Sequence, residues 1–369
     1  MEIDRSNYCE IERLFTDLKN HISIKGVING CLPGKIFSDK DRLSAVAITP
    51  QGIFLGGNLN NEGFLQDINN VIKQDILPAY RKRGQVDYVI FYPQYIDEEK
   101  VLNIMFDGLY PMKSTRMTFS KDICNVVNEL PEDIFVVNKE LLLNSDLHGL
   151  EGVIEEISGG WSSIDDFLER GFGCVAVKDC NIVGWCLTDW VIGNECEIGI
   201  ETYSEYRRQG YGYKLACGIL SIAKRKGMIR TGWQCWADNY GSIATAKSAG
   251  FELLSEFPVL FAWAEPLNNM IVNGTYYMTG RENLNIPPDY QRSAWCFSQA
   301  LDKGWDWGGN PTLYWNCACM YYKSGQIELA RHYYRLALGK GWNGIEQHID
   351  NPYVYTNIDI EEILFKEND

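Results

Sequence analysis

A basic, glycine-containing loop lies between a predicted strand and a predicted helix in the middle of the chain. The strand covers residues 195–202, the loop contains Arg207, Gly210 and Gly212, and the helix covers residues 213–226. The first N–H groups of a helix have no intrahelical acceptor and lie at the positive end of its dipole, so they attract anions. Glycine lets the backbone approach a ligand closely, and arginine adds positive charge. The pattern therefore predicts a cradle for the phosphates of a ligand.

Two well-known phosphate-binding motifs do not fit this loop. A dinucleotide-binding fingerprint needs a third glycine where the chain has Leu215, and a P-loop needs Gly-Lys-Ser or Gly-Lys-Thr, which is absent. A Gly-x-Gly before a helix is also common as a plain turn or cap, and for the loop alone this alternative stays open. The following stretch favours a ligand site, because a strand at 231–236, Asn239 and a short helix at 241–248 continue the α/β pattern.

Residues 173–263 resemble the GNAT superfamily of acetyl-CoA-dependent N-acetyltransferases. The matching residues are Arg207, Gly210 and Gly212 of an Arg-x-x-Gly-x-Gly pattern, with Asn239, Gly250 and Phe251 downstream. Further stretches are similar to the branch of zwittermicin A resistance acetyltransferases, namely Glu197-Ile198-Gly199-Ile200, Tyr206-Arg207-Arg208, Trp233-x-Cys235-Trp236 and Asn239-x-x-Ser242. The resemblance covers roughly residues 1–265 and is strongest over 195–263.

The resemblance implies an acetyl-CoA site around the loop. In this family the strand before the loop splays from its neighbour, the pantetheine arm pairs with the free strand edge, and the loop holds the pyrophosphate. The donor-binding residues implied in this way are Ile200, Glu201, Thr202, Arg207, Arg208, Gln209, Gly210, Tyr211, Gly212, Tyr213 and Asn239. Asn239 would bind the pantetheine arm, but it is equally suited to capping the helix at 241–248, and both roles stay open.

Acetyl transfer requires a neutral amine, so a carboxylate that removes a proton, directly or through a water, is expected near the thioester. Members of the superfamily often carry this glutamate on the strand before the loop. Glu197 is then the first candidate for the general base and Glu195 the second. Alternate residues of a strand share a face, so one carboxylate could act as base while the other binds the substrate cation. Ordinary solvent-facing strand residues are the alternative.

The acceptor side is predicted from aromatic and acidic residues on neighbouring strands. Trp185 is a candidate wall for an ammonium group through cation–π contact, although a core role is the alternative, and Asp189 is a candidate anchor for the amine. The general acid is not assigned, because Ala246 stands where many relatives carry a tyrosine. Tyr240, Tyr213 or unassisted departure of the thiolate are the alternatives.

The elements around these residues predict an α/β protein of three parts. Residues 1–125 are expected to form a degenerate GNAT-like α/β domain, and residues 126–266 the catalytic GNAT domain with a mixed, splayed central sheet. Residues 267–369 are expected to form an all-α domain, because the block Ala-Leu-x-Lys-Gly-Trp at 300–305 recurs at 337–342. This last part resembles a tetratricopeptide (TPR) repeat. One and a half repeats cannot form a free solenoid, so we expect them to pack on the body, a second copy or a protein partner.

Composition limits the remaining possibilities. The chain has 369 residues, of which 46% are hydrophobic and 22% charged, and a net charge of −15. These values are typical of a packed globule and disfavour nucleic-acid or anionic-membrane binding. The 12 cysteines form no Cys-x-x-Cys and the 4 histidines are scattered, so no metal site is expected. The charged first residues and the lack of a long apolar run lead us to expect neither a signal peptide nor a membrane span, and hence a cytoplasmic protein.

The predicted function is transfer of acetyl from acetyl-CoA to a primary amine of a small cationic molecule. The resemblance to the zwittermicin A branch implies an amine-bearing peptide or aminopolyol antibiotic, and hence resistance or self-protection. The competing prediction is an interaction protein that senses acetyl-CoA and acts through its helical repeats. The intact pattern at Arg207, Gly210 and Gly212 favours the enzyme.

Overall fold

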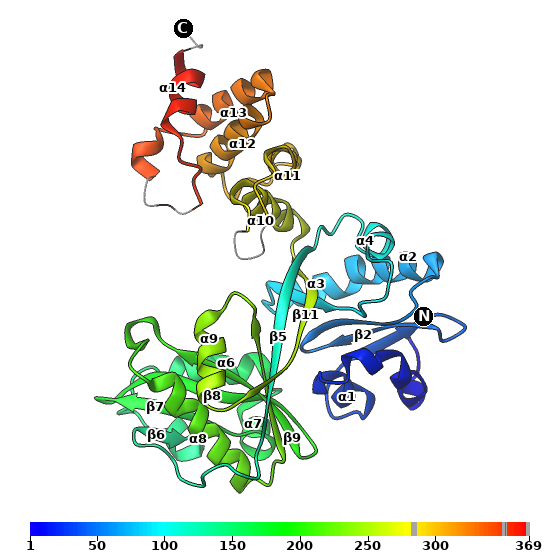
Figure 1. Cartoon of the computed structure of the whole chain (residues 1–369), viewed down its shortest axis with the longest axis vertical. Helices are drawn as coiled ribbons and strands as arrows, with labels where there is room; N and C mark the ends of the chain where they lie inside the picture. The colour runs from blue at the N-terminus through cyan, green and yellow to red at the C-terminus, as the bar shows by residue number, and fades with distance from the viewer. Residues whose placement is uncertain (282–285, 349–350, 352, 367–369) are drawn as a thin grey trace. The chain divides into compact units, whose positions relative to one another are not determined.

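The structure is a computed structural model that describes residues 1–281, 286–348, 351 and 353–366 (Figure 1). Among these residues, 11 strands form one sheet in the order β1-β2-β3-β4-β11-β5-β10-β9-β8-β7-β6. The sheet is mixed, since β9 is antiparallel to β8 and parallel to β10. Helices α10 to α14 follow it along the chain. The prediction of an α/β fold with a mixed central sheet and a helical C-terminal region is confirmed.

The elements have the following bounds. The strands are β1 (Lys35–Ser38), β2 (Ser44–Thr49), β3 (Gly52–Gly57), β4 (Asp87–Phe91), β5 (Met112–Asp122), β6 (Ile134–Val136), β7 (Gly173–Lys178), β8 (Asn181–Ile192), β9 (Glu195–Thr202), β10 (Arg230–Trp236) and β11 (Glu252–Trp263). The α-helices are α1 (Ile22–Ile28), α2 (Glu62–Val71), α3 (Leu77–Lys82), α4 (Glu98–Met105), α5 (Lys139–Leu142), α6 (Leu150–Gly160), α7 (Ile164–Arg170), α8 (Tyr211–Arg225), α9 (Tyr240–Ser248), α10 (Pro266–Thr279), α11 (Tyr290–Asp302), α12 (Pro311–Lys323), α13 (Ile327–Gly339) and α14 (Ile358–Lys366). No helix in the described ranges is long and apolar enough to cross a membrane.

Strand β9 separates from β10 halfway along its length. The two strands pair in parallel from Glu195 with Arg230 to Ile198 with Trp233. Their described pairing ends there, whereas β8 remains paired with β9 to its end. The edge of β9 over residues 199–202 is therefore open on the side of β10, as the splayed sheet of the predicted fold requires.

The alternation of side chains along β9 determines which face of the sheet holds the core. Cys196 and Ile198 belong to a buried cluster with α8, whose apolar residues recur at helical spacing. Glu195 and Glu197 lie on the opposite face, because successive side chains of a strand point to opposite sides. Because Cys196 and Ile198 pack under α8, Glu195 and Glu197 must lie on the face of the sheet that points away from α8.

The chain forms two compact units. The first comprises residues 1–68, 89–101 and 113–260, and the second comprises residues 69–88, 102–112 and 261–369. The first unit contains the predicted loop, Asn239 and all the candidate carboxylates. The second combines the C-terminal helices with two short segments from the first third of the chain. The division into three domains at residues 125 and 266 stays a prediction.

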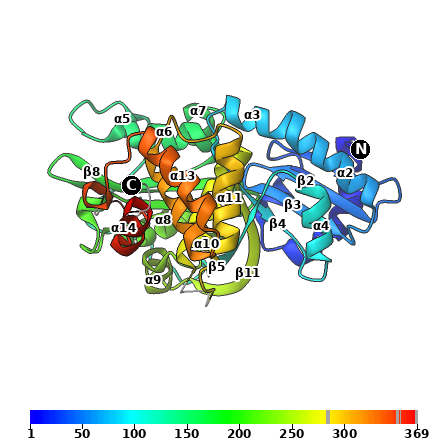
Figure 2. The ribbon, with the colours of Figure 1, turned by 90° about the horizontal axis from the view of Figure 1, so that it is seen from above.

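The repeated sequence block of the second unit ends two helices in the same way. After α11, Trp305 N–H donates to Ala300 C=O (3.0 Å), and after α13, Trp342 N–H donates to Ala337 C=O (2.9 Å). The glycine before each tryptophan has a positive φ, of 76° and 96°. This is the left-handed cap that glycine favours at helix C-termini. The repeat therefore encodes a helix end, and α10 to α13 lie side by side in chain order (Figures 1 and 2).

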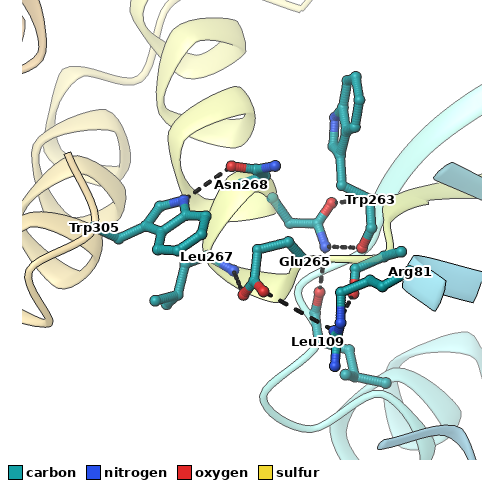
Figure 3. A network of polar contacts seen from close by, with 9 residues as sticks. Arg81, Leu109, Trp263, Glu265, Leu267, Asn268 and Trp305 are labelled. Atoms are coloured by element: carbon teal, nitrogen blue, oxygen red, sulfur yellow. Dashed lines mark hydrogen bonds and ion pairs between the residues drawn. The ribbon is translucent and has the colours of Figure 1, made fainter. Parts of the chain in front are cut away.

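A buried asparagine, Asn269, ties together three segments of the second unit; Figure 3 shows its surroundings, including Leu109, Trp263 and Trp305. Asn269 Oδ1 accepts from Trp263 N–H (2.6 Å), and its amide nitrogen donates to Leu109 C=O (2.9 Å) and Trp263 C=O (3.0 Å). The neighbouring Asn268 Oδ1 accepts from the indole of Trp305 (2.8 Å). The start of α10 is thus fixed to the end of β11, to the segment 102–112 and to the helical hairpins.

We expect Asn269→Ala to lower the free energy of unfolding by about 2–4 kcal/mol, measured in urea. The change removes three hydrogen bonds and leaves buried backbone groups without partners. Asn273→Ala is the matched control, because it removes one hydrogen bond, to Tyr110 C=O (3.0 Å), and should cost about 1 kcal/mol. Equal losses in the two variants would contradict this role of Asn269.

Candidate active site

The loop before α8 presents unpaired backbone N–H groups at a helix start. Gly210 has φ 86°, a left-handed conformation that favours glycine, and stands immediately before α8. The N–H of Lys214 donates to Gly210 C=O (3.1 Å). The three preceding N–H groups, at residues 211–213, therefore have no acceptor within the helix. Backbone donors and helix dipole together suit a phosphate group.

Gly212 lies between α9 and the end of β9. A Cβ at this position would lie 3.4 Å from Thr245 of α9 and 3.6 Å from Thr202 at the end of β9. Both are ordinary contact distances, so the fold does not require glycine here. The absence of a side chain leaves room between the loop, the β9 edge and α9. The resemblance predicts that the pyrophosphate and the pantetheine arm of acetyl-CoA bind along this part of the chain.

The predicted donor-binding residues lie on the end of β9, the loop and the start of α9. The side chain of Arg207 turns back to Thr202 C=O (3.0 Å). The ring of Tyr211 is buried in the core under α8, so only its backbone faces the loop. Asn239 caps α9 by accepting from Ser242 N–H (3.0 Å). The capping role of Asn239 is thus present, and its role toward pantetheine stays a prediction.

Others among these residues are more accessible. Tyr213 and Tyr240, the alternatives for the tyrosine missing at Ala246, are exposed, whereas Ala246 is buried. Arg208 is exposed and has φ 63°. The amide of Gln209 donates to Glu205 C=O (3.1 Å), within the turn that precedes α8.

Glu197 is a buried carboxyl group, with 4% of its surface exposed. Burial raises its pKa to about 7, against the effect of Arg116, Arg230 and a hydrogen bond from Gln234, which all lower the pKa. A general base works best when its pKa is close to the pH of the reaction. The surroundings of Glu197 therefore suit proton transfer at neutral pH.

Glu195, the second candidate, is held by cations. Its carboxylate forms ion pairs with Arg230, directly across on β10, and with Lys25 of α1 (3.6 Å). These two ion pairs occupy the carboxylate oxygens of Glu195. The geometry favours Glu197 as base and Glu195 as the group that holds Arg230.

Asp189 lies beside the predicted base. It is the extra residue of a β-bulge in β8, where the register with β9 shifts between Thr188 and Trp190. Its Oδ1 lies 2.8 Å from the position that a Cβ on Gly199 would occupy. Burial raises the pKa of Asp189 well above its usual range, and the charge of Glu197 adds to this shift. A cationic amine near these two carboxyl groups would relieve their repulsion.

The side chain of Trp185 is the apolar neighbour of Asp189 and Gly199. Its side chain is buried in a cluster with residues of α6 and α7. One ring carbon lies 3.6 Å from the Cβ position of Gly199. The ring thus belongs to the core and also approaches the strand edge beside Asp189.

Sequence reasoning does not identify Thr118 and Gln234, which lie on the same face of the sheet as the strand tryptophan Trp190. Trp190 is opposite Glu197 in the strand register, and Thr118 is opposite Gln234. Trp190 Nε1, Thr118 Oγ1 and Gln234 Oε1 are buried and have no hydrogen-bond partner within the part of the chain that the structure describes. Buried polar atoms normally have a partner, so these three atoms suit a polar acceptor molecule. The sequence signal for Gln234 is its place between the apolar residues Trp233 and Cys235 of a predicted strand, which puts it on the opposite face from them.

Comparison with known proteins gives consistent results. A family model described as GNAT acetyltransferase matches residues 12–260. The chain is 21% identical over 266 residues to the uncharacterized N-acetyltransferase YdfB of Bacillus subtilis, covering 71% of this chain and 98% of that protein. A GCN5-related N-acetyltransferase-like protein from Streptococcus suis has the same fold, with TM-score 0.51, 18% identity, and 70% and 98% of the two chains covered.

Proposed function

Since the chain belongs to the GNAT acetyltransferase family over residues 12–260, and is thus an acetyl-CoA-dependent N-acetyltransferase, we propose that its acceptor is a primary amine of a small cationic molecule. The observation that carries this proposal is the pair of adjacent carboxyl groups, Glu197 and Asp189, beside the open edge of β9. Burial favours the neutral form of both carboxyl groups, so an ammonium ion beside them would stabilise their ionised form and be held by it.

In the proposed reaction, acetyl-CoA supplies a thioester that an amine can attack. The N–H groups at the start of α8 would hold its phosphates, and the edge of β9 over residues 199–202 would pair with its pantetheine arm. Glu197 takes a proton from the ammonium group of the acceptor. The neutral nitrogen then forms the C–N bond as the C–S bond breaks. The sulfur leaves as the thiolate, the nitrogen loses its second proton to solvent as the amide forms, and the proton held by Glu197 is then also released to solvent.

We further propose an amine-bearing peptide or aminopolyol antibiotic as the acceptor, with resistance or self-protection as the role. The similarity of residues 195–263 to the zwittermicin A resistance branch supports this class of acceptor. The net charge of −15 also favours a cationic substrate.

We also propose that α11 to α13 form a TPR-like unit that binds a second copy of the chain or a protein partner. Two observations support the TPR likeness: the antiparallel hairpins and the repeated cap at Trp305 and Trp342. The alternative function, acetyl-CoA sensing through these helices, would use the same donor site without acetyl transfer.

Release of CoA thiol from acetyl-CoA, measured over a panel of amines, tests the proposed function. The panel contains linear diamines, amino sugars and basic peptides, each with its N-acetylated analogue as control. We expect thiol release only with free amines, and a product carrying one added acetyl group. Binding of acetyl-CoA without release by any member of the panel would favour the sensing alternative.

A further inference from the structure

A histidine from the N-terminal part of the chain lies next to the predicted acceptor site. His21 immediately precedes α1, and its ring packs among Phe54, Phe91 and Phe257, with 5.4, 4.6 and 4.9 Å between ring centroids. Burial, and to a smaller extent the charge of Arg116, lowers the pKa of His21 to about 3. The ring is therefore neutral at every pH at which the enzyme would work. A neutral imidazole can accept one hydrogen bond.

Gln234 of β10 connects His21 to Glu197. Its amide nitrogen lies 3.1 Å from Nδ1 of His21, and its side chain also hydrogen-bonds to Glu197. With the ring proton of His21 on Nε2, its Nδ1 and the carboxylate are both acceptors, and the two N–H bonds of the amide point to them. Oε1 of Gln234 is then left over, buried and unpaired among the described residues. It is available to an N–H of the acceptor amine.

The strand register places these groups on one face. Glu197 is opposite Gly232, and Gln234 follows two residues later on the same side of β10. The charges acting on Glu197 come from Arg116 of β5 and Arg230 of β10, and the charge of Glu197 in turn raises the pKa of Asp189 of β8. His21 adds no charge to this set. Its influence on Glu197 must pass through the orientation of the Gln234 amide.

We propose that His21 is a positioning residue of the active site, which fixes the Gln234 amide with its N–H toward Glu197 and its oxygen toward the acceptor amine. The N-terminal part of the chain, in which the sequence shows no catalytic motif, thereby completes the acceptor site. This inference rests on the proposed function. Without an acceptor at Nδ1, the amide can turn its oxygen toward Glu197, where it stabilises the protonated carboxyl.

Two substitutions separate this role from simple packing. His21→Phe keeps a ring among the three phenylalanines but removes the acceptor, whereas His21→Asn keeps an acceptor close to the position of Nδ1. We expect the rising limb of the pH–rate profile to move up by about one pH unit in His21→Phe, since a hydrogen bond to a carboxylate is lost. The limb should stay in place in His21→Asn. An unmoved limb in His21→Phe, or equal shifts in both, would overturn the proposal.

A carbon NMR titration of the Glu197 carboxyl provides a readout that does not depend on turnover. The protein carries labelled glutamate, and the Glu197→Gln variant identifies the signal. We expect the same upward shift of the Glu197 titration in His21→Phe and in Gln234→Leu. Shifted titrations with no amine-dependent turnover in the wild type would mean that the proposed function has failed while the positioning holds. If the wild type acetylates amines but the Glu197 titration does not shift in the two variants, the positioning role of His21 is refuted and the proposed function stands.

Discussion

Glu197→Gln should lower turnover about 10²–10⁴-fold, the usual contribution of a general base, while the affinity for acetyl-CoA stays unchanged. Glutamine preserves the size of the side chain and its capacity for hydrogen bonding, but it cannot take a proton from the acceptor. The loss should be smallest at high pH, where more of the amine is neutral without help. Steady-state kinetics across pH, together with calorimetry of acetyl-CoA binding, measures both effects.

The matched control is Glu195→Gln, on the same face of the same strand. Because Glu195 is paired with Arg230 and Lys25, its substitution should change turnover far less. If Glu197 only binds the cation of the substrate, Glu197→Gln should instead raise the Michaelis constant for the amine and leave the shape of the pH profile unchanged. Turnover close to that of the wild type in Glu197→Gln would exclude Glu197 as the base.

Gly212→Ala should weaken acetyl-CoA binding about 10- to 100-fold without loss of stability. The added methyl group fits beside Thr245 and Thr202, at 3.4 and 3.6 Å, and alanine favours the helix more than glycine does. It would nevertheless occupy the space that the phosphates and the pantetheine arm need next to the N–H groups of α8. Losing one or two charge-assisted hydrogen bonds accounts for the size of the effect.

Gly159→Ala, in the exposed last turn of α6, is the control for this substitution, because a Cβ there meets nothing within 4 Å. Calorimetry should find unchanged affinity in Gly159→Ala and reduced affinity in Gly212→Ala. Gly210 is less suitable for the test, since its φ of 86° would strain any other residue whatever binds there. Equal affinities in the two alanine variants would show that the donor does not approach Gly212.

The sequence was informative where the chemistry is local. The strand predicted at residues 195–202 is β9, and the predicted loop and helix follow it in the structure. These elements are predictable because side-chain alternation, glycine and helical spacing are patterns within a few consecutive residues. The start of α8 at Tyr211, two residues earlier than predicted, follows from the left-handed conformation of Gly210, which ends the loop there.

The residues that the sequence did not reveal come together through long-range pairing. His21, Arg116 and Gln234 are far apart in the chain, and they meet because β5 lies next to β10 and α1 packs against β8 and β9. No periodicity within one segment encodes such a strand order. The ion pairs of Glu195 depend in the same way on Lys25 and on the parallel pairing of β9 with β10. The perturbed pKa of Glu197 follows from this assembly.

The pH dependence of kcat/KM for a reactive amine, compared in wild type and Glu197→Gln, tests the central claim most directly. A base must be unprotonated to act, and burial raises the pKa of Glu197 to about 7. The wild-type rate should therefore rise through a limb near pH 7, and this limb should be missing in Glu197→Gln, where only the ionisation of the amine itself remains. A limb near pH 7 that persists in Glu197→Gln, or a wild-type profile without one, would contradict proton transfer to Glu197.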